Sequence, residues 1–122
     1  MRQMTIVLKG VPPSLNRTAG RANVWEYREL KRDWTTAAYY ACKASKDRPA
    51  EPFEKALVEI TYYFPDLRRR DPDNYSGKFL MDGLKKAGAI KDDDFRHVRL
   101  LLDGSYDKEN PRTEIKITEE DI

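Results

Sequence analysis

The chain contains four short apolar segments of the length and composition that are typical of β-strands. The clearest runs through residues 55–64, where Val58, Ile60, Tyr62 and Phe64 alternate with more polar positions and share one face. Three further segments are predicted as strands: residues 5–9, 98–102 and 113–118.

Two other segments carry apolar residues at steps of three and four, which is the spacing of one helix face. The first predicted helix starts at Asn23, which together with Glu26 matches a capping box, and it fades by residues 47–49. The second is predicted over about residues 75–87, and Gly88 stands where a left-handed helix cap is favoured. The predicted order is therefore β-α-β-α-β-β.

Length and composition fit one α+β domain over residues 1–122, with a mixed sheet packed by helices. One Cys and one His allow neither an internal disulfide nor a Cys/His zinc site, and they exclude multi-histidine catalysis. The cysteine count favours a reducing compartment. No apolar run approaches the ~20 residues of a membrane span, and the N-terminus lacks the apolar run of a signal peptide. We therefore expect a soluble, cytoplasmic protein without a membrane partner.

The net charge of +2 hides an uneven distribution. The first fifty residues carry ten basic and four acidic groups, whereas residues 101–122 carry three basic and seven acidic groups. A basic region attracts polyanions such as nucleic acid, although a solvated protein face has the same composition.

One acidic motif joins the best predicted strand to the second helix, with the sequence Arg68-Arg69-Arg70-Asp71-Pro72-Asp73-Asn74. Pro72 favours an extended Asp71, and if Asp73 is extended too, both carboxylates project to the same side. Asn74 is well placed to cap the helix. Two neighbouring carboxylates repel each other unless a cation lies between them, and Mg²⁺ prefers such oxygen ligands.

A second acidic run, Asp92-Asp93-Asp94, follows the second helix. If the flanking strands are adjacent in the sheet, one of these residues and the Asp71/Asp73 pair meet at the same edge. The alternative is structural, because Asp side chains commonly bond local backbone in caps and turns. The basic residues around both runs favour a function. His97 has no evident partner and fits a sheet residue better than a catalytic base.

These motifs, in this order, resemble the RusA family of Holliday junction resolvases. The resemblance rests on the Arg68–Asn74 motif and on the positions that follow it: Lys78, Met81-Asp82-Gly83-Leu84, Ala87-Gly88 and Asp92-Asp93. The segment Pro12-Pro13-Ser14-Leu15-Asn16-Arg17 is also similar to the N-terminal motif of that family.

The resemblance implies a small homodimeric, Mg²⁺-dependent endodeoxyribonuclease that nicks four-way DNA junctions in recombination and repair. The essential aspartates of the family map to Asp71, Asp73 and Asp93, and its important lysine maps to Lys78. The spacing from Asn74 to Lys78 is one residue longer than in the best-known members, and Asp92 is an alternative metal ligand.

Five arginines are candidates for binding DNA phosphates: Arg17, Arg21, Arg68, Arg69 and Arg70. Lys78 is a candidate for orienting water or neutralising phosphate charge, and the alternative is an exposed helix residue paired with Asp82. Three other functions stay open: a nuclease with broader branched or flapped substrates, a non-catalytic branched-DNA-binding protein with a structural acidic cluster, and an oligomeric scaffold.

Overall fold

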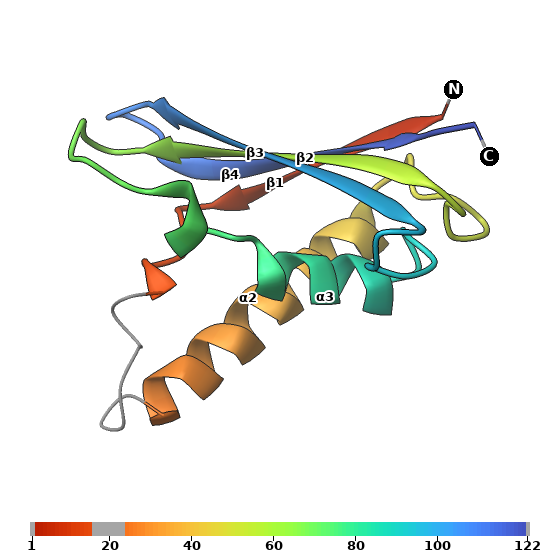
Figure 1. Ribbon diagram of the computed structural model, residues 1–122, viewed down its shortest axis with the longest axis horizontal. Coiled ribbons are helices and arrows are strands. Elements are labelled where there is room, and N and C mark those ends of the chain that lie inside the picture. Colours follow the sequence, from red (N-terminus) through yellow and green to blue (C-terminus); the bar gives the residue numbers. More distant parts are fainter. Residues whose placement is uncertain (1, 16–23, 122) are drawn as a thin grey trace.

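The computed structural model describes residues 2–15 and 24–121. Its elements in chain order are β1 (Gln3–Lys9), α2 (Val24–Ala44), β2 (Ala56–Phe64), the short 3₁₀ helix η2 (Pro72–Asn74), α3 (Lys78–Lys86), β3 (Val98–Tyr106) and β4 (Arg112–Glu119) (Figure 1). The predicted α+β class and the order of strands and main helices are confirmed.

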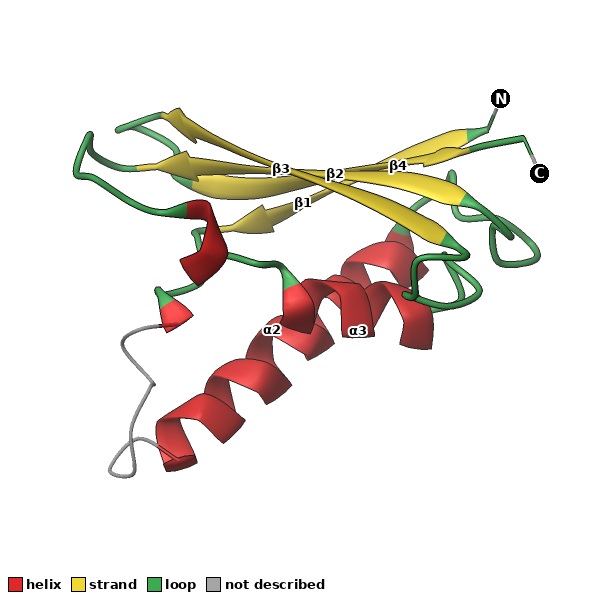
Figure 2. Cartoon of the chain, viewed as in Figure 1, coloured by secondary structure: helices red, strands yellow, loops and turns green. Residues whose placement is uncertain are grey.

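The four strands form one mixed sheet in the order β1-β4-β2-β3. β4 is antiparallel to both of its neighbours, whereas β2 and β3 are parallel. Figure 2 shows α2 and α3 together on one face of this sheet, while none of the described helices lies on the other face. β1 and β3 are the two edge strands of the described sheet.

The core lies between the sheet and the two helices. Alternate strand residues face it, as in β1, where Met4, Ile6 and Leu8 are buried while their neighbours are exposed. In β2 the expected alternation is present, with Val58 and Ile60 fully buried. One-sided burial of this kind fixes the register, because a slip by one residue would turn the apolar face to water.

α3 packs closely on α2 at Gly83. A Cβ atom at this position would lie 2.5 Å from the carbonyl oxygen of Thr35, so only glycine fits without moving a helix. Beside this contact the Thr35 hydroxyl donates a hydrogen bond of 3.0 Å to the carbonyl of Phe79. The two helices therefore form one closely packed layer on the sheet.

The second helix starts later than the sequence predicts. Asn74 lies in η2, and its N–H donates to the carbonyl of Asp71 at 3.0 Å, so it does not cap α3. Gly77 takes the N-cap position instead, in a left-handed conformation with φ of 76°. β3 is longer than expected and extends four residues beyond Leu102, because all nine of its residues pair with β2. The predicted start of the first helix, Asn23, lies outside the described residues.

Candidate functional site

Asp71 and Asp73 lie in the connection from β2 to α3, and both are exposed. Asp71 is extended, with φ of −102° and ψ of 134°, as the following proline predicts. Asp73, however, lies within the 3₁₀ turn η2. The condition on which the two carboxylates were expected to project to the same side, an extended Asp73, is therefore not met, because the chain turns at Asp73.

The three arginines of the motif have different environments. The guanidinium of Arg70 lies 4.3 Å from the centre of the Phe64 ring and forms an ion pair of 2.8 Å with Asp66. Its side chain is only 17% exposed, whereas those of Arg68 and Arg69 are 83% and 90% exposed. Arg70 therefore holds the loop together, and the other two project into solvent.

The loop around these arginines is ordered by Asp66. The backbone N–H of Arg68 donates to the Asp66 carboxylate at 3.1 Å, and this bond, followed by the one from Arg70, lowers the pKa of that carboxyl. Arg69 pairs with a different carboxylate, and its Nε lies 3.4 Å from Oδ1 of Asp71. Among the described residues, the ion pair of the candidate metal ligand Asp71 is thus with the most exposed of the three arginines.

Two hollows follow the edge strand β3 on the helix side. A cavity of about 180 Å³ lies beside its second half, where Asp71 and Gly104 are among the lining residues. A larger groove of about 640 Å³ lies beside its first half, between β3 and α3. The groove brings together Lys78 and Asp93, two candidate site residues that are fifteen positions apart in sequence.

The parallel pairing of β2 and β3 determines how the two acidic runs are separated. The flanking strands are adjacent, as the proposed site requires. Asp71 follows the carboxyl end of β2, whereas Asp92, Asp93 and Asp94 precede the amino end of β3. In a parallel pair these are opposite ends. The expectation that adjacent strands bring the two acidic runs together is therefore wrong, because α3 returns the chain to the starting end of β2 before β3 begins.

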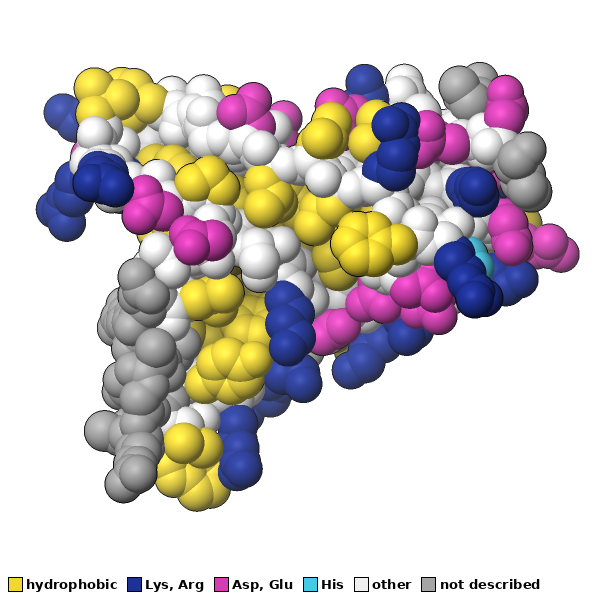
Figure 3. Space-filling view, in the orientation of Figure 1, with side chains coloured by type: hydrophobic (Ala, Val, Ile, Leu, Met, Phe, Trp, Pro, Cys, Tyr) yellow, Lys and Arg dark blue, Asp and Glu magenta, His cyan; other side chains and the backbone are white. Residues whose placement is uncertain are grey.

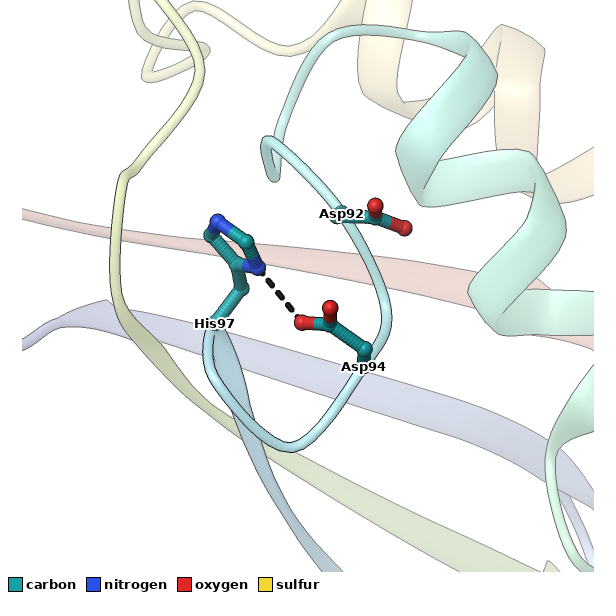
Figure 4. A group of neighbouring side chains, drawn as sticks. All are labelled: Asp92, Asp94 and His97. Atoms are coloured by element: carbon teal, nitrogen blue, oxygen red, sulfur yellow. Dashed lines mark hydrogen bonds and ion pairs between the residues drawn. The ribbon is translucent and has the colours of Figure 1, made fainter.

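The turn before β3 contains a compact group of possible metal ligands. One ligand atom each from Asp92, Asp94 and His97 lies within 4.8 Å of the others (Figure 4). His97 has a partner that sequence analysis missed, since its Nδ1 lies 2.5 Å from Oδ1 of Asp94. The sequence signal for this contact was the spacing, because Asp94 stands three residues before His97 and such residues meet in a turn. The turn is also closed by the backbone, since the carbonyl of Asp94 accepts hydrogen bonds from the N–H groups of His97 and Val98.

Asp92 and Asp94 are occupied by contacts within this turn. The pKa of the Asp92 carboxyl is lowered, first by the N–H of Asp93 at 2.8 Å and then by Lys85 at 3.1 Å. The hydrogen bond to His97 lowers the pKa of Asp94, and Asp92 raises that of Lys85. Asp93 is less constrained, because its carboxylate lies 4.0 Å from the Lys85 ammonium.

The donor sets suit different cations. Carboxylate oxygens are the protein ligands that Mg²⁺ prefers, and imidazole nitrogen suits transition metals better. Within the parts of the chain that the structure describes, Asp71, Asp73 and Asp93 do not form one preassembled group, whereas Asp92, Asp94 and His97 do. The described acidic residues thus fit a divalent cation in general.

Lys78 is the first residue of α3 and is exposed in the groove. No ion pair joins it to Asp82 among the described side chains, so the alternative interpretation of Lys78 as a partner of Asp82 has no support in the structure. Lys85, which sequence analysis did not single out, is instead the lysine that pairs with the acidic turn. Arg17 and Arg21 lie outside the described residues.

Comparison with known protein families identifies the class of this protein. An endodeoxyribonuclease family, described as Endodeoxyribonuclease RusA, matches residues 10–118. The match covers nearly the whole chain of 122 residues. The chain therefore belongs to the RusA family. Comparison with individually curated proteins gives no match. None of the described helices has the length and apolar character needed to cross a membrane.

Proposed function

We propose that this chain is a Mg²⁺-dependent endonuclease that resolves four-way DNA junctions by paired, symmetric nicks. Membership of the RusA family supports an endodeoxyribonuclease. The observation in the structure that carries the proposal is the groove between α3 and β3, which brings the exposed Lys78 to the same surface as Asp93. In such an open groove the ammonium group of Lys78 can contact a phosphodiester, and the carboxylate of Asp93 can bind a metal ion.

In this proposal Asp71, Asp73 and Asp93 are the carboxylates that serve Mg²⁺, and Asp92 is the alternative to Asp93. Asp71 and Asp73 lie by one end of the β2–β3 pair and Asp93 by the other, so they are not ligands of one ion within a single chain. A bound Mg²⁺ would supply an activated water and stabilise charge on the transferred phosphoryl group. Lys78 neutralises the charge that develops on the phosphate. Asp93 fits the ligand role better than Asp92 does, because Asp92 already accepts a backbone hydrogen bond and pairs with Lys85.

DNA binding is assigned to the exposed arginines. Arg68 and Arg69 form ion pairs of 3.5 Å with Asp66 and 3.4 Å with Asp71, but their side chains are largely exposed to solvent and can meet phosphates. Arg70 is instead held by Phe64 and Asp66. Arg17 and Arg21 remain proposed contacts. Such contacts give affinity that falls steeply with salt and little base selectivity. A homodimer would supply the two sites that paired nicks require.

The test is cleavage of an end-labelled four-way junction beside its linear duplex, with Mg²⁺ or with EDTA. We expect symmetric nicks in the junction alone, abolished by EDTA and by Asp73→Asn, with junction binding retained in that variant. Nicking of flaps at an equal rate would indicate a nuclease with broader substrates. Binding without nicking in Mg²⁺ would contradict the proposal and indicate a junction-binding protein. In that case the acidic turn would be structural, a role that fits the hydrogen bonds within it. Absence of binding at low salt would indicate a scaffold.

A further inference from the structure

The cavity beside the second half of β3 is walled by aromatic rings. Tyr62, Phe64 and Tyr75 all line this space of about 180 Å³. Their ring centres lie 5.2 to 6.1 Å apart, within the range of stable aromatic pairs, so the three rings form one continuous wall. An apolar cavity of roughly 150 Å³ is enough to hold a benzene ring. The cavity therefore has room for one flat ring against an aromatic wall.

Gly104 keeps this cavity open on the side of β3. A Cβ atom at this position would lie 3.4 Å from the Phe64 ring, so a larger side chain would fill space that the ring now borders. The pairing of β3 with β2 has no bulge at this point, and the φ angle of Gly104 is not positive. Neither feature therefore requires a glycine here. A glycine inside a strand often marks a place where a ligand comes close to the backbone.

Tyr62 adds a polar group to this largely apolar space. The residue is only 3% exposed, and within the described parts of the chain its hydroxyl makes no hydrogen bond. Since every fully buried polar side-chain atom there has a partner, this hydroxyl is not sealed within the protein. It lies near Leu102 of the cavity lining, because a Cβ atom on Gly77 would be 3.5 Å from the hydroxyl and 3.8 Å from Leu102. Burial raises the pKa of the hydroxyl, so it stays protonated and can donate as well as accept.

The cavity lies beside the candidate metal ligand Asp71, which is part of its lining. Arg69, at 3.4 Å from Asp71, has a side chain that is 90% exposed and can contact a phosphate. Figure 3 shows hydrophobic side chains directly beside acidic ones in the region where η2 lies in Figure 1. A polynucleotide held by its phosphates at Arg69 therefore brings its bases within reach of the aromatic wall.

We propose that this cavity binds one unstacked nucleobase from the branch point of the DNA. The inference rests on the proposed function, and it adds a base-binding site to the metal and phosphate contacts given there. The flat base stacks on the aromatic wall, and the Tyr62 hydroxyl exchanges a hydrogen bond with its polar edge. Stacking of this kind accepts every base, because each base has a π face.

Such a site favours branched DNA over linear duplex. A base inside a duplex is paired and stacked on both sides, so its removal into a protein cavity is costly. At a branch point the stack is interrupted, and the same removal costs less. The cavity therefore selects the structure of the DNA more than its sequence, and its lining residues determine specificity without taking part in the chemistry.

The first experiment measures the affinity of the full chain for four-way junctions in EDTA, by fluorescence anisotropy. One junction is intact, and the other carries abasic nucleotides at every branch-point position. We expect the native chain to bind the intact junction about tenfold more tightly. Gly104→Val fills the cavity and should bind both junctions equally. The matched control is Ser105→Val, an exposed neighbour on the other face of β3, which should keep the native difference. Equal affinities of the native chain for the two junctions, or a Gly104→Val variant that keeps the difference, overturn the inference.

Removal of one hydroxyl tests the site without emptying it. Tyr62→Phe keeps the ring in the aromatic wall, so the fold should be retained, and melting curves check this. We expect this variant to bind the intact junction a few-fold more weakly and the abasic junction as tightly as the native chain does. The matched control is Tyr63→Phe, the next residue of β2, whose ring lies under Arg112 on the other face of the sheet. It should change neither affinity. A Tyr62→Phe variant with native affinity for the intact junction, or with equal losses for both junctions, contradicts the inference.

Cleavage assays separate this inference from the proposed function. Mg²⁺-dependent nicking by a native chain that binds intact and abasic junctions equally would overturn the base site and leave the nuclease. A native chain that prefers the intact junction, loses this preference in Gly104→Val and never nicks DNA would support the base site and contradict the proposed function. The binding experiments contain no Mg²⁺, so neither result depends on the other.

Discussion

Two neighbouring aspartates in the turn before β3 differ in their contacts, since Asp92 accepts a backbone hydrogen bond and pairs closely with Lys85, whereas Asp93 lies 4.0 Å from Lys85. This difference gives a prediction for single residues. Asp93→Asn should lower Mg²⁺-dependent junction nicking by more than about a hundredfold, as expected for loss of a metal ligand, with little change in melting temperature. Asp92→Asn should lower the melting temperature, because Lys85 and the Asp93 N–H lose their charged partner, while nicking persists. Parallel nicking rates and melting curves check this, and the reverse pattern would make Asp92 the ligand.

Adjacent arginines in the motif differ in the same way. Arg70→Ala should lower the melting temperature by a few degrees, because it removes the stack on Phe64 and the ion pair with Asp66. Arg69→Ala should leave melting unchanged and weaken junction binding, reducing the salt slope by about one. Thermal melting and binding titrations at several salt concentrations distinguish the two. Equal effects on melting would contradict the division of roles.

Sequence patterns predicted the candidate residues but not these differences between neighbours. Nothing in three consecutive arginines indicates which one meets Phe64, because that depends on how the loop returns over β2. The partner of His97 was within reach of sequence analysis, since Asp94 stands three residues before it. It was missed because residues 94–97 were not expected to form a turn that brings these two side chains together.

At the scale of elements, the contact of α3 with α2 depends on Gly83. Gly83→Ala should lower stability by about 1–3 kcal/mol, because the added methyl would overlap the carbonyl of Thr35 and separate the helices. The matched control is Lys86→Ala, an exposed position on the same helix, which should be neutral. Denaturant unfolding measures both, and a neutral Gly83→Ala would show that the helices adjust freely.

The acidic turn before β3 should make the stability of the fold depend on pH in the acid range. The pKa values of Asp92 and Asp94 are lowered in the folded chain, so their contribution to stability is present above the ordinary carboxyl value and is lost as pH falls through the lowered one. We expect Asp94→Asn to flatten the fall in melting temperature below about pH 4. Melting curves from pH 7 to pH 2 test this. An unchanged acid profile would mean that the hydrogen bond to His97 does not stabilise the fold.

Element boundaries show where local sequence information ends. The strands with one buried face were predicted from alternation, as in β2. The start of α3 was misplaced because Asn74 is as good a cap by composition as any residue nearby, and the left-handed Gly77 reflects the geometry of the loop. The end of β3, residues 103–106, has no apolar alternation and is a strand only because β2 lies beside it.

For the whole molecule, the sequence predicted the class and order of elements but not the arrangement of the site. A strand–helix–strand unit usually returns the chain in the same direction, so the parallel pairing of β2 and β3 followed a general rule. That pairing sets the two acidic runs at opposite ends of the strand pair. The position of β4 between β1 and β2 depends on long-range packing and had no signal in the sequence.

The central position of β4 has a consequence for how the chain folds during synthesis. β1 leaves the ribosome first, yet its only partner in the described sheet is β4, which is made more than a hundred residues later. Until β4 is made, the helices have only the β2–β3 pair above them, and β1 has no ladder to join. Domains dominated by such distant pairings fold slowly. A nascent chain stalled before β4 should therefore remain sensitive to protease along most of its length, and completion of this one strand should convert it to the folded domain.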